Sequence, residues 1–267
     1  MNQYGDFGRE TEELMKICEK NNQISTELFK EFGVKRGLRD LDGTGVLTGI
    51  TNISKIVAFR MEDGKKVPCD GQLWYRGYKV TDLIRGFEGK RYGFEEVAYL
   101  PNVEQLASFK RMLSECMQLP TNFTRDVIMK APSKDLMNSL TRSVLTLASY
   151  DESLGDQELH TQLEQCMKLI SVFPMLAVYG YHSYNHYLRD DSLYIHRPQE
   201  GLSIAENILR MLRPDQKYTE LEARVLDIAL VLHMEHGGGN NSTFTTRVVT
   251  SSGSDTYSVM AAALSSL

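Results

Sequence analysis

Residues 232–249 read LHMEHGGGNNSTFTTRVV, and this stretch predicts the end of a helix followed by a small polar pocket. His233 and His236 lie three residues apart at the end of a helical pattern, and three consecutive glycines follow them. Glycine lets backbone approach a ligand closely and adopts the left-handed conformation that ends many helices. Small hydroxyl and amide residues come next, beginning with Asn240.

Helices are predicted on both sides of this stretch. Thr219 and Glu222 have the spacing of a capping box, in which each side chain accepts a hydrogen bond from the other residue's backbone N–H. Beyond the polar stretch, Asp255 is the expected N-cap of a helix over residues 256–264. Before it, apolar residues recur at helical spacing at Leu221, Val225, Ile228 and Leu232.

The two histidines have different expected roles. A cation near a helix C-terminus is favoured by the helix dipole, and we assign His233 a structural role on that ground. His236 immediately precedes the glycines and is assigned to the pocket. The spacing indicates no third protein ligand beside the pair, so no metal is predicted. A helical metalloprotein that uses both histidines remains an alternative.

The region before residue 79 has a different residue pattern from the rest of the chain. A charged amphipathic stretch from about Glu10 to Phe32 predicts a helix ended by Gly33, within an N-terminal helical segment over residues 1–36. After it, β-branched residues are punctuated by Asp-Gly dipeptides, which favour tight turns. The dipeptides are Asp42-Gly43, Asp63-Gly64 and Asp70-Gly71. The expected strands cover residues 46–48, 53–59 and 72–75, with a further one at Val67.

From Lys79 onward, apolar residues at spacings of three and four predict one helix after another. Pro174 falls inside a long apolar pattern, and a proline in a helix interior kinks or divides it. The predicted fold is therefore mainly α, with a small antiparallel β region near the N-terminus. The predicted helices cover residues 102–118, 122–128, 133–150, 159–187 and 203–211.

The amino-acid composition argues against several classes of protein. The 267 residues include 42% hydrophobic residues, enough for a substantial core, and 30 basic against 35 acidic residues give a net charge of −5. This balance offers no case for nucleic-acid binding. No apolar run reaches the length of a membrane span, and the N-terminus lacks a signal-peptide core. Four scattered cysteines without a CxxC pair favour free thiols in a reducing compartment, so we expect a cytoplasmic protein.

Several stretches resemble motifs of one enzyme family. Residues 232–249 are similar, nearly residue for residue, to the oxaloacetate-binding segment of citrate synthases. Residues 71–78, GQLWYRGY, with Asp82 and Leu83 after them, resemble a signature near the start of these enzymes. Looser similarities cover residues 53–56, 135–145 and 173–177.

Arg76 is the charged residue of the second motif. Its aromatic neighbours can cover the apolar stem while the guanidinium binds a carboxylate or carbonyl groups. We expect a structural role, in which Arg76 locks the small sheet to the helical body.

The resemblance implies a large and a small domain that close over substrate, in a homodimer with helices packed across the interface. The implied reaction condenses acetyl-CoA with oxaloacetate to give citrate and CoA, and it needs no cofactor. Because 2-methylcitrate synthases share these motifs, that activity remains an alternative. Residues 37–267 then correspond to an incomplete large domain. His236 is implied as an oxaloacetate contact, and Asn240 as a residue that shapes the same pocket.

Two departures from the family pattern affect this expectation. Leu100 is followed directly by Pro101, whereas the family usually has a further apolar, glycine-containing stretch between this leucine and proline. The sequence also stops at Leu267, where the family continues into a Gly-Pro-x-His-Gly-Gly-Ala-Asn motif. Proton removal from a thioester methyl group needs a carboxylate base and a donor to the enol oxygen. The family places that aspartate and histidine beyond Leu267, so no catalytic residue is assigned and the chain alone is expected to be inactive. A non-catalytic helical dimerisation module is a further alternative.

Overall fold

The computed structural model describes residues 25–33, 38–40, 42, 45–46, 51–98, 106–235, 237 and 240–266. The chain divides into two compact units, Met1–Leu47 and Thr48–Leu267. In the first unit, helix α2 (Thr26–Glu31) begins after Ser25, whose hydroxyl accepts a hydrogen bond from a backbone N–H of the first turn. Gly33 follows the helix with φ 61°, as predicted. The remainder of the predicted N-terminal helix, and most of the strand predicted at 46–48, lie outside the described residues.

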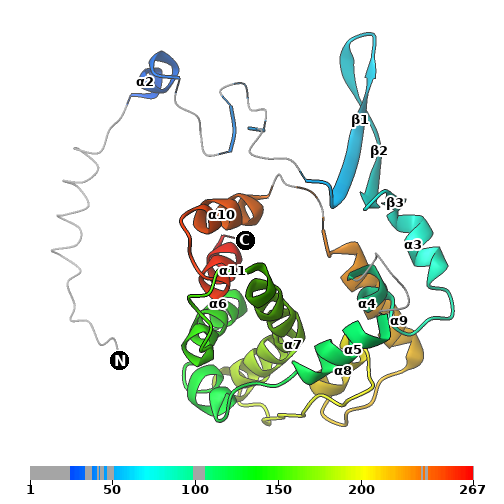
Figure 1. The fold of residues 1–267 in the computed structure, drawn as a ribbon, viewed down its shortest axis with the longest axis vertical. Coiled ribbons are helices and arrows are strands. Elements are labelled where there is room, and N and C mark those ends of the chain that lie inside the picture. Colours follow the sequence, from blue (N-terminus) through cyan, green and yellow to red (C-terminus); the bar gives the residue numbers. More distant parts are fainter. Residues whose placement is uncertain are drawn as a thin grey trace. The chain divides into compact units, whose positions relative to one another are not determined.

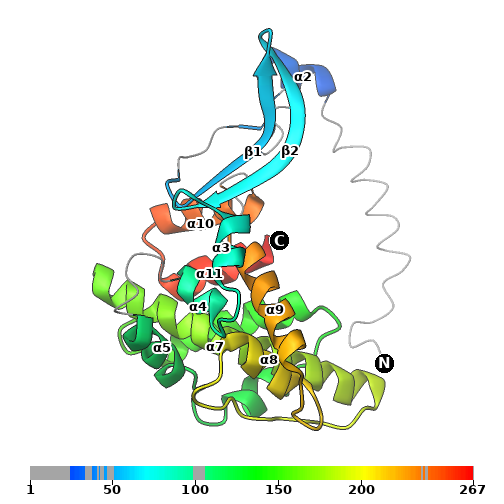
Figure 2. The same ribbon diagram turned by 90° about the vertical axis from the view of Figure 1, so that its right-hand side faces the viewer.

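The second unit begins with a small antiparallel sheet of three strands in the order β1 (Ser54–Glu62), β2 (Lys65–Tyr75) and β3 (Tyr78–Lys79). Strands β1 and β2 form a long hairpin, which extends beyond the helices of this unit in both views (Figures 1 and 2). Asp63 and Gly64 make the predicted turn with φ of 50° and 76°, and such positive values are what a two-residue hairpin turn requires.

The turn predicted at Asp70-Gly71 is wrong. These residues lie inside β2, so that the strands predicted at Val67 and at 72–75 are one strand. The register shifts between Val57, paired with Gln72, and Phe59, paired with Pro68. The dipeptide therefore falls in a β-bulge, where pairing with β1 overrides the local preference for a turn.

The helices follow one another closely along the chain. They are α3 (Val80–Gly86), α4 (Gly93–Ala98), α5 (Leu106–Glu115), the π-helix η2 (Thr124–Ile128), α6 (Leu136–Leu147), the 3₁₀-helix η3 (Ala148–Tyr150), α7 (Leu159–Arg189), α8 (Ile204–Leu212), α9 (Glu220–Leu232), α10 (Asn241–Ser251) and α11 (Thr256–Ser265). Each predicted helical stretch contains helix, although residues 102–105 lie outside the described residues. Helix α10 was not predicted, because its threonines and serines are weak helix formers.

The two predicted helix N-caps, Thr219 and Asp255, are confirmed. Thr219 and Glu222 make both hydrogen bonds of a capping box at the start of α9. Asp255 caps α11 by accepting a hydrogen bond from the Ser258 backbone N–H. Pro174 does not divide α7, which is continuous for 31 residues; its ribbon is bent rather than straight (Figure 1).

The main core lies among α5, α6, α7, α8 and α11, which we call the helical body. Helix α6 packs against α7 and α11, and α7 also packs against α5 and α8. The side chains with at most 1% of their surface exposed include Phe123, Leu147, Val172, Leu176, Met211 and Tyr257. Burial of such large apolar groups is the main stabilising contribution to a fold of this kind.

Helix α9 buries a different face from its apolar stripe. Ala223, Asp227 and Val231 are buried, whereas Leu221 and Val225 of the predicted stripe are 70% and 59% exposed. The helix is thus confirmed, but the stripe is on its uncovered side. Within the described ranges, no helix combines the length and the apolar character needed to cross a membrane.

Candidate functional site

The residues assigned to the pocket lie on the link between α9 and α10. His233 is the C-cap of α9, and its Nδ1 donates to the carbonyl oxygen of Ala229 at 2.8 Å, a structural contact at a helix end. His236 lies outside the described residues. Asn240 is the N-cap of α10, where its Oδ1 accepts from the backbone N–H of Ser242 at 2.9 Å and from the Ser242 hydroxyl at 2.7 Å. Asn240 therefore orients the first turn of α10.

A metal centre would need several ligands close together. Among the described residues, no group of three or more His, Cys, Asp and Glu side chains is arranged to hold a metal ion. Because His236 is not among these residues, a site built on His233 and His236 remains a hypothesis.

The base of the hairpin contacts the chain where it leaves α9. Glu235 Oε1 accepts a hydrogen bond from the Ser54 hydroxyl at 2.9 Å and another from the Gly237 backbone N–H at 2.5 Å. Gly237 has φ 90°, and a Cβ added to it would lie 3.2 Å from Ile56 Cδ1. Glycine is therefore favoured here by its backbone conformation, and the close approach of β1 adds a tight contact for any larger residue.

Tyr75 at the end of β2 makes the second connection. Its side chain is 2% exposed, and its hydroxyl lies 2.9 Å from the carbonyl oxygens of both Val231 and Glu235. Burial raises the pKa of Tyr75, which keeps the hydroxyl protonated as a donor. The hydroxyl thus joins the end of β2 to the backbone at the end of α9 and just beyond it. We call the contacts of Ser54, Ile56, Tyr75, Glu235 and Gly237 the hairpin junction.

The role predicted for Arg76 is wrong. Arg76 is exposed, has φ 48°, and donates through Nη1 to Asn52 Oδ1 at 3.3 Å, just before β1. Its neighbour Tyr75 is the residue that locks the sheet to the helices. The reason is geometric: in this strand the tyrosine points to the buried face, and the next residue in the turn points to solvent. The buried tyrosine was already present in the quoted motif.

Buried carboxylates fix α9 relative to α4. Asp227 accepts hydrogen bonds from the backbone N–H groups of Gly93 at 2.9 Å and Phe94 at 3.0 Å, at the start of α4. A Cβ on Gly93 would lie 2.5 Å from Asp227 Oδ2, so this close cap requires glycine. Burial raises the pKa of Asp227, although the two hydrogen bonds oppose this effect.

Glu95 connects α4 to α8 in the same manner. Its Oε1 accepts from the Ile204 backbone N–H at 2.8 Å, while its buried Oε2 has no hydrogen-bond partner among the described residues. The side chain is 3% exposed, and this burial raises its pKa to about 7. The carboxylates of Asp227 and Glu95 therefore link α9, α4 and α8.

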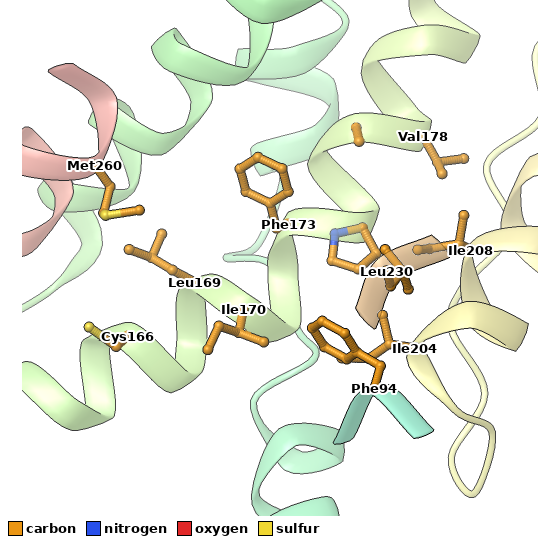
Figure 3. Close-up of a pocket in the computed structure, with 12 residues that line it drawn as sticks. Phe94, Cys166, Leu169, Ile170, Phe173, Val178, Ile204, Ile208, Leu230 and Met260 are labelled. Carbon is orange, nitrogen blue, oxygen red and sulfur yellow. The ribbon is translucent and has the colours of Figure 1, made fainter. Parts of the chain in front are cut away.

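An apolar cavity of about 440 Å³ lies against the bend of α7 (Figure 3). Its lining includes Phe94 of α4, Ile208 of α8, Leu230 of α9 and Met260 of α11, around Phe173 of α7. The thiol of Cys166 also lines it; the residue is exposed, but desolvation by the apolar surroundings raises the pKa of the thiol, which makes it a poor nucleophile. The cavity is suited to apolar groups and offers no acid or base for catalysis.

The sequence was compared with protein families and with characterised relatives. A family model described as "Citrate synthase, C-terminal domain" matches residues 40–267. The citrate synthase of Haloferax volcanii is 32% identical over 245 residues, covering 88% of this chain and 57% of the relative. The 2-methylcitrate synthase of Shewanella oneidensis is 30% identical over 201 residues, covering 73% and 50%.

The similarity extends to solved structures. The crystal structure of citrate synthase from Pyrobaculum aerophilum matches with a TM-score of 0.69 at 26% identity, covering 91% of this chain and 58% of that chain. The chain spans little more than half the length of these relatives. Sequence motifs, helical fold and family match agree, and the chain belongs to the citrate synthase family.

Proposed function

We propose that this chain supplies the oxaloacetate-binding part of an enzyme that condenses acetyl-CoA with oxaloacetate, giving citrate and CoA. The observation that carries the proposal is the match of residues 40–267 to the citrate synthase family, which includes the stretch between α9 and α10. In this proposal His236 contacts oxaloacetate and Asn240 shapes the pocket. The reaction needs no cofactor, since acetyl-CoA is itself a substrate, and we place it in the cytoplasm.

The geometry around the link supports an anionic ligand. Helix α10 begins at Asn241, and the N-terminus of a helix favours a carboxylate through its dipole and its free N–H groups. The preceding glycines let the backbone approach such a ligand. Oxaloacetate carries two carboxylates and a polarisable carbonyl, so this end of α10 suits one of its charged groups.

A 2-methylcitrate synthase is the alternative. Enzymes of that name are 30% identical to the chain in Shewanella oneidensis and 27% identical in Mycobacterium tuberculosis. The two activities differ by one methyl group of the acyl-CoA, and a methyl group in an apolar pocket is worth only about 1–3 kcal/mol of discrimination. Comparing acetyl-CoA with propionyl-CoA in the complete enzyme that contains these residues distinguishes the two.

We also propose that the protein forms a homodimer. Apolar side chains on α7, α10 and α11 are uncovered in the single chain, and contiguous exposed apolar surface favours association. They are Leu159, Leu163, Ile170, Phe244, Val248 and Met260, with exposed fractions from 37% to 80%. Light scattering at micromolar concentration should show a dimer or a larger species, and a clean, folded monomer would refute the proposal.

Activity tests the central proposal. The family places the carboxylate base and the enol-stabilising histidine in segments that follow the residue matching Leu267, so the chain alone should release no CoA above background from acetyl-CoA and oxaloacetate. The complete enzyme that carries the same residues should release CoA. Persistent turnover by the purified chain would show that the catalytic groups are elsewhere than the family places them, and a complete enzyme without turnover would refute the function.

The two histidines provide the residue-level test. In the complete enzyme, His236→Ala should lower catalytic efficiency at least tenfold, because a hydrogen bond to a charged substrate is worth about 1.5–3 kcal/mol. The matched variant His233→Ala removes a helix-end contact and should act mainly on stability. Finding the first variant active but thermally fragile, and the second inactive but stable, would reverse the two assignments.

A further inference from the structure

We propose that Glu235 is a positioning residue, which ties strand β1 to the backbone leaving α9 and thereby holds the chain on both sides of the proposed oxaloacetate contact. The proposal rests on the proposed function, since it assigns Glu235 to the support of His236. Glu235 is not assigned a contact with substrate. Its effect is transmitted through the backbone at positions 235 and 237.

One carboxylate oxygen makes the connection. Glu235 Oε1 accepts from a side chain 181 residues earlier, the Ser54 hydroxyl, and from a backbone N–H two residues later, that of Gly237. Hydrogen bonds to an ionised carboxylate are stronger than those between neutral groups. The same atom therefore couples the hairpin to the backbone of Gly237, and moving either one disturbs the other.

Two further contacts give this coupling a fixed geometry. Ile56 of β1 lies against Gly237, where an added Cβ would make a tight contact of 3.2 Å with Ile56 Cδ1. The hydroxyl of Tyr75, at the end of β2, lies 2.9 Å from the carbonyl oxygen of Glu235 itself. The backbone of Glu235, its side chain and the following glycine are thus each contacted by the hairpin. A site needs such support to keep a ligand-binding group in place.

Packing alone gives Glu235 little reason to be where it is. The side chain is only half-buried, and the end of α9 is already capped by His233 and by Tyr75. Substitution of a residue that served only stability would lower the free energy of unfolding and raise amide exchange throughout the unit. Loss of a positioning residue instead raises amide exchange near positions 235 and 237 and weakens the binding of ligand beside them.

Amide hydrogen exchange tests directly whether the hydrogen bonds of Glu235 hold this backbone in place. In Glu235→Ala, exchange across residues 232–237 should rise about tenfold, as expected for the loss of a hydrogen bond of about 1.4 kcal/mol. Glu235→Gln should restore slow exchange, because an amide can accept from Gly237 and pair with Ser54. The matched control is Glu222→Ala, which removes a carboxylate that accepts backbone N–H at the opposite end of α9. It should accelerate exchange near Thr219 and leave residues 232–237 unchanged.

Ligand binding tests the consequence. With ¹³C-labelled histidine, oxaloacetate at millimolar concentration should shift the His236 ring resonances of the native chain. The shift should shrink severalfold in Glu235→Ala and return in Glu235→Gln. If Glu235→Ala does not fold, Ser54→Ala removes one donor to the same oxygen and should give the same changes at smaller size.

The two measurements separate the possible failures. Unchanged exchange at residues 232–237 in both Glu235→Ala and Ser54→Ala would overturn the proposal, and so would faster exchange with an undiminished His236 shift. If the native chain shows no shift with oxaloacetate, the proposed function fails, while the exchange result still decides whether Glu235 holds the backbone at positions 235 and 237 in place.

Discussion

The helical body and the hairpin junction are held together in different ways. In the helical body, side chains such as Phe123, Leu147 and Val172 are completely buried among residues of several helices. Among the described residues, the apolar cluster that contains Tyr75 has four buried members, and the contacts that define the junction are mainly hydrogen bonds. The first region depends on apolar area removed from water, and the second on donors and acceptors in fixed positions.

This difference determines how each region should respond to change. Apolar burial is non-directional and shared among many neighbours, so a lost side chain in the body lowers the stability of the whole unit. The loss of a hydrogen bond at the junction makes local opening of the nearby backbone easier and leaves the packing of the core intact. The junction also contains the residues next to the proposed ligand contact, and a functional site requires such local precision.

The largest effect is expected in the helical body. Phe123 is 0% exposed and its ring contacts the ring of Tyr150 edge-on, with centroids 5.6 Å apart. Phe123→Ala should lower the free energy of unfolding by about 3–5 kcal/mol, because it removes a buried ring and leaves a cavity. Urea unfolding followed by circular dichroism measures it. A loss below about 1 kcal/mol would contradict the view of this region as the stabilising core.

A pH-dependent effect is expected at the link between α4 and α8. The folded pKa of Glu95, about 7, is above its unfolded value of 4.5. The stability that this proton provides is fully present below the unfolded value and is lost as the pH rises through 7. Glu95→Gln should therefore raise the free energy of unfolding by up to about 3 kcal/mol at pH 8 and by less than about 1 kcal/mol at pH 5.

Urea unfolding of native chain and variant at both pH values measures this difference. Glu96→Gln is the matched control, because the Glu96 carboxylate pairs with Lys90 nearer the surface. The free energy of unfolding of Glu96→Gln should not rise above that of the native chain at pH 8. An equal gain for Glu95→Gln at pH 5 and pH 8 would contradict a titrating buried carboxyl group.

A smaller effect is expected at the junction. Tyr75→Phe removes the hydroxyl that lies between the Val231 and Glu235 carbonyl groups. It should lower the free energy of unfolding by about 1–2 kcal/mol and accelerate amide exchange at the end of α9. The control Tyr92→Phe loses an exposed hydrogen bond to the Gly201 carbonyl. If both variants lose the same stability, the junction has no special role.

The smallest effect is expected at the outer part of the hairpin. Phe59 is 48% exposed and contacts Lys66 through a cation–π interaction, with Nζ 4.7 Å from the ring centroid. Phe59→Ala should change the free energy of unfolding by about 0.5 kcal/mol or less, in contrast to Phe123→Ala. Thermal unfolding of the two variants side by side gives the comparison. Equal losses would mean that the hairpin belongs to the cooperative core.

The sequence by itself determined the features that depend on neighbours along the chain. The cap at Thr219, the cap at Asp255 and the turn at Asp63-Gly64 were all predicted, because each depends on residues within one turn. The family was also identified from local motifs. Helix α10 was missed, because its weak local propensity did not indicate the helix that the fold imposes.

Only the tertiary structure decided which distant residues meet. Tyr75 and Glu235 belong to two motifs about 160 residues apart, and no spacing rule indicates that one supports the other. The burial that raises the pKa of Glu95 likewise arises from packing of α4 against α8 and α9. Hydrogen-bond geometry and desolvation depend on positions in space, so they become defined only when the chain has folded.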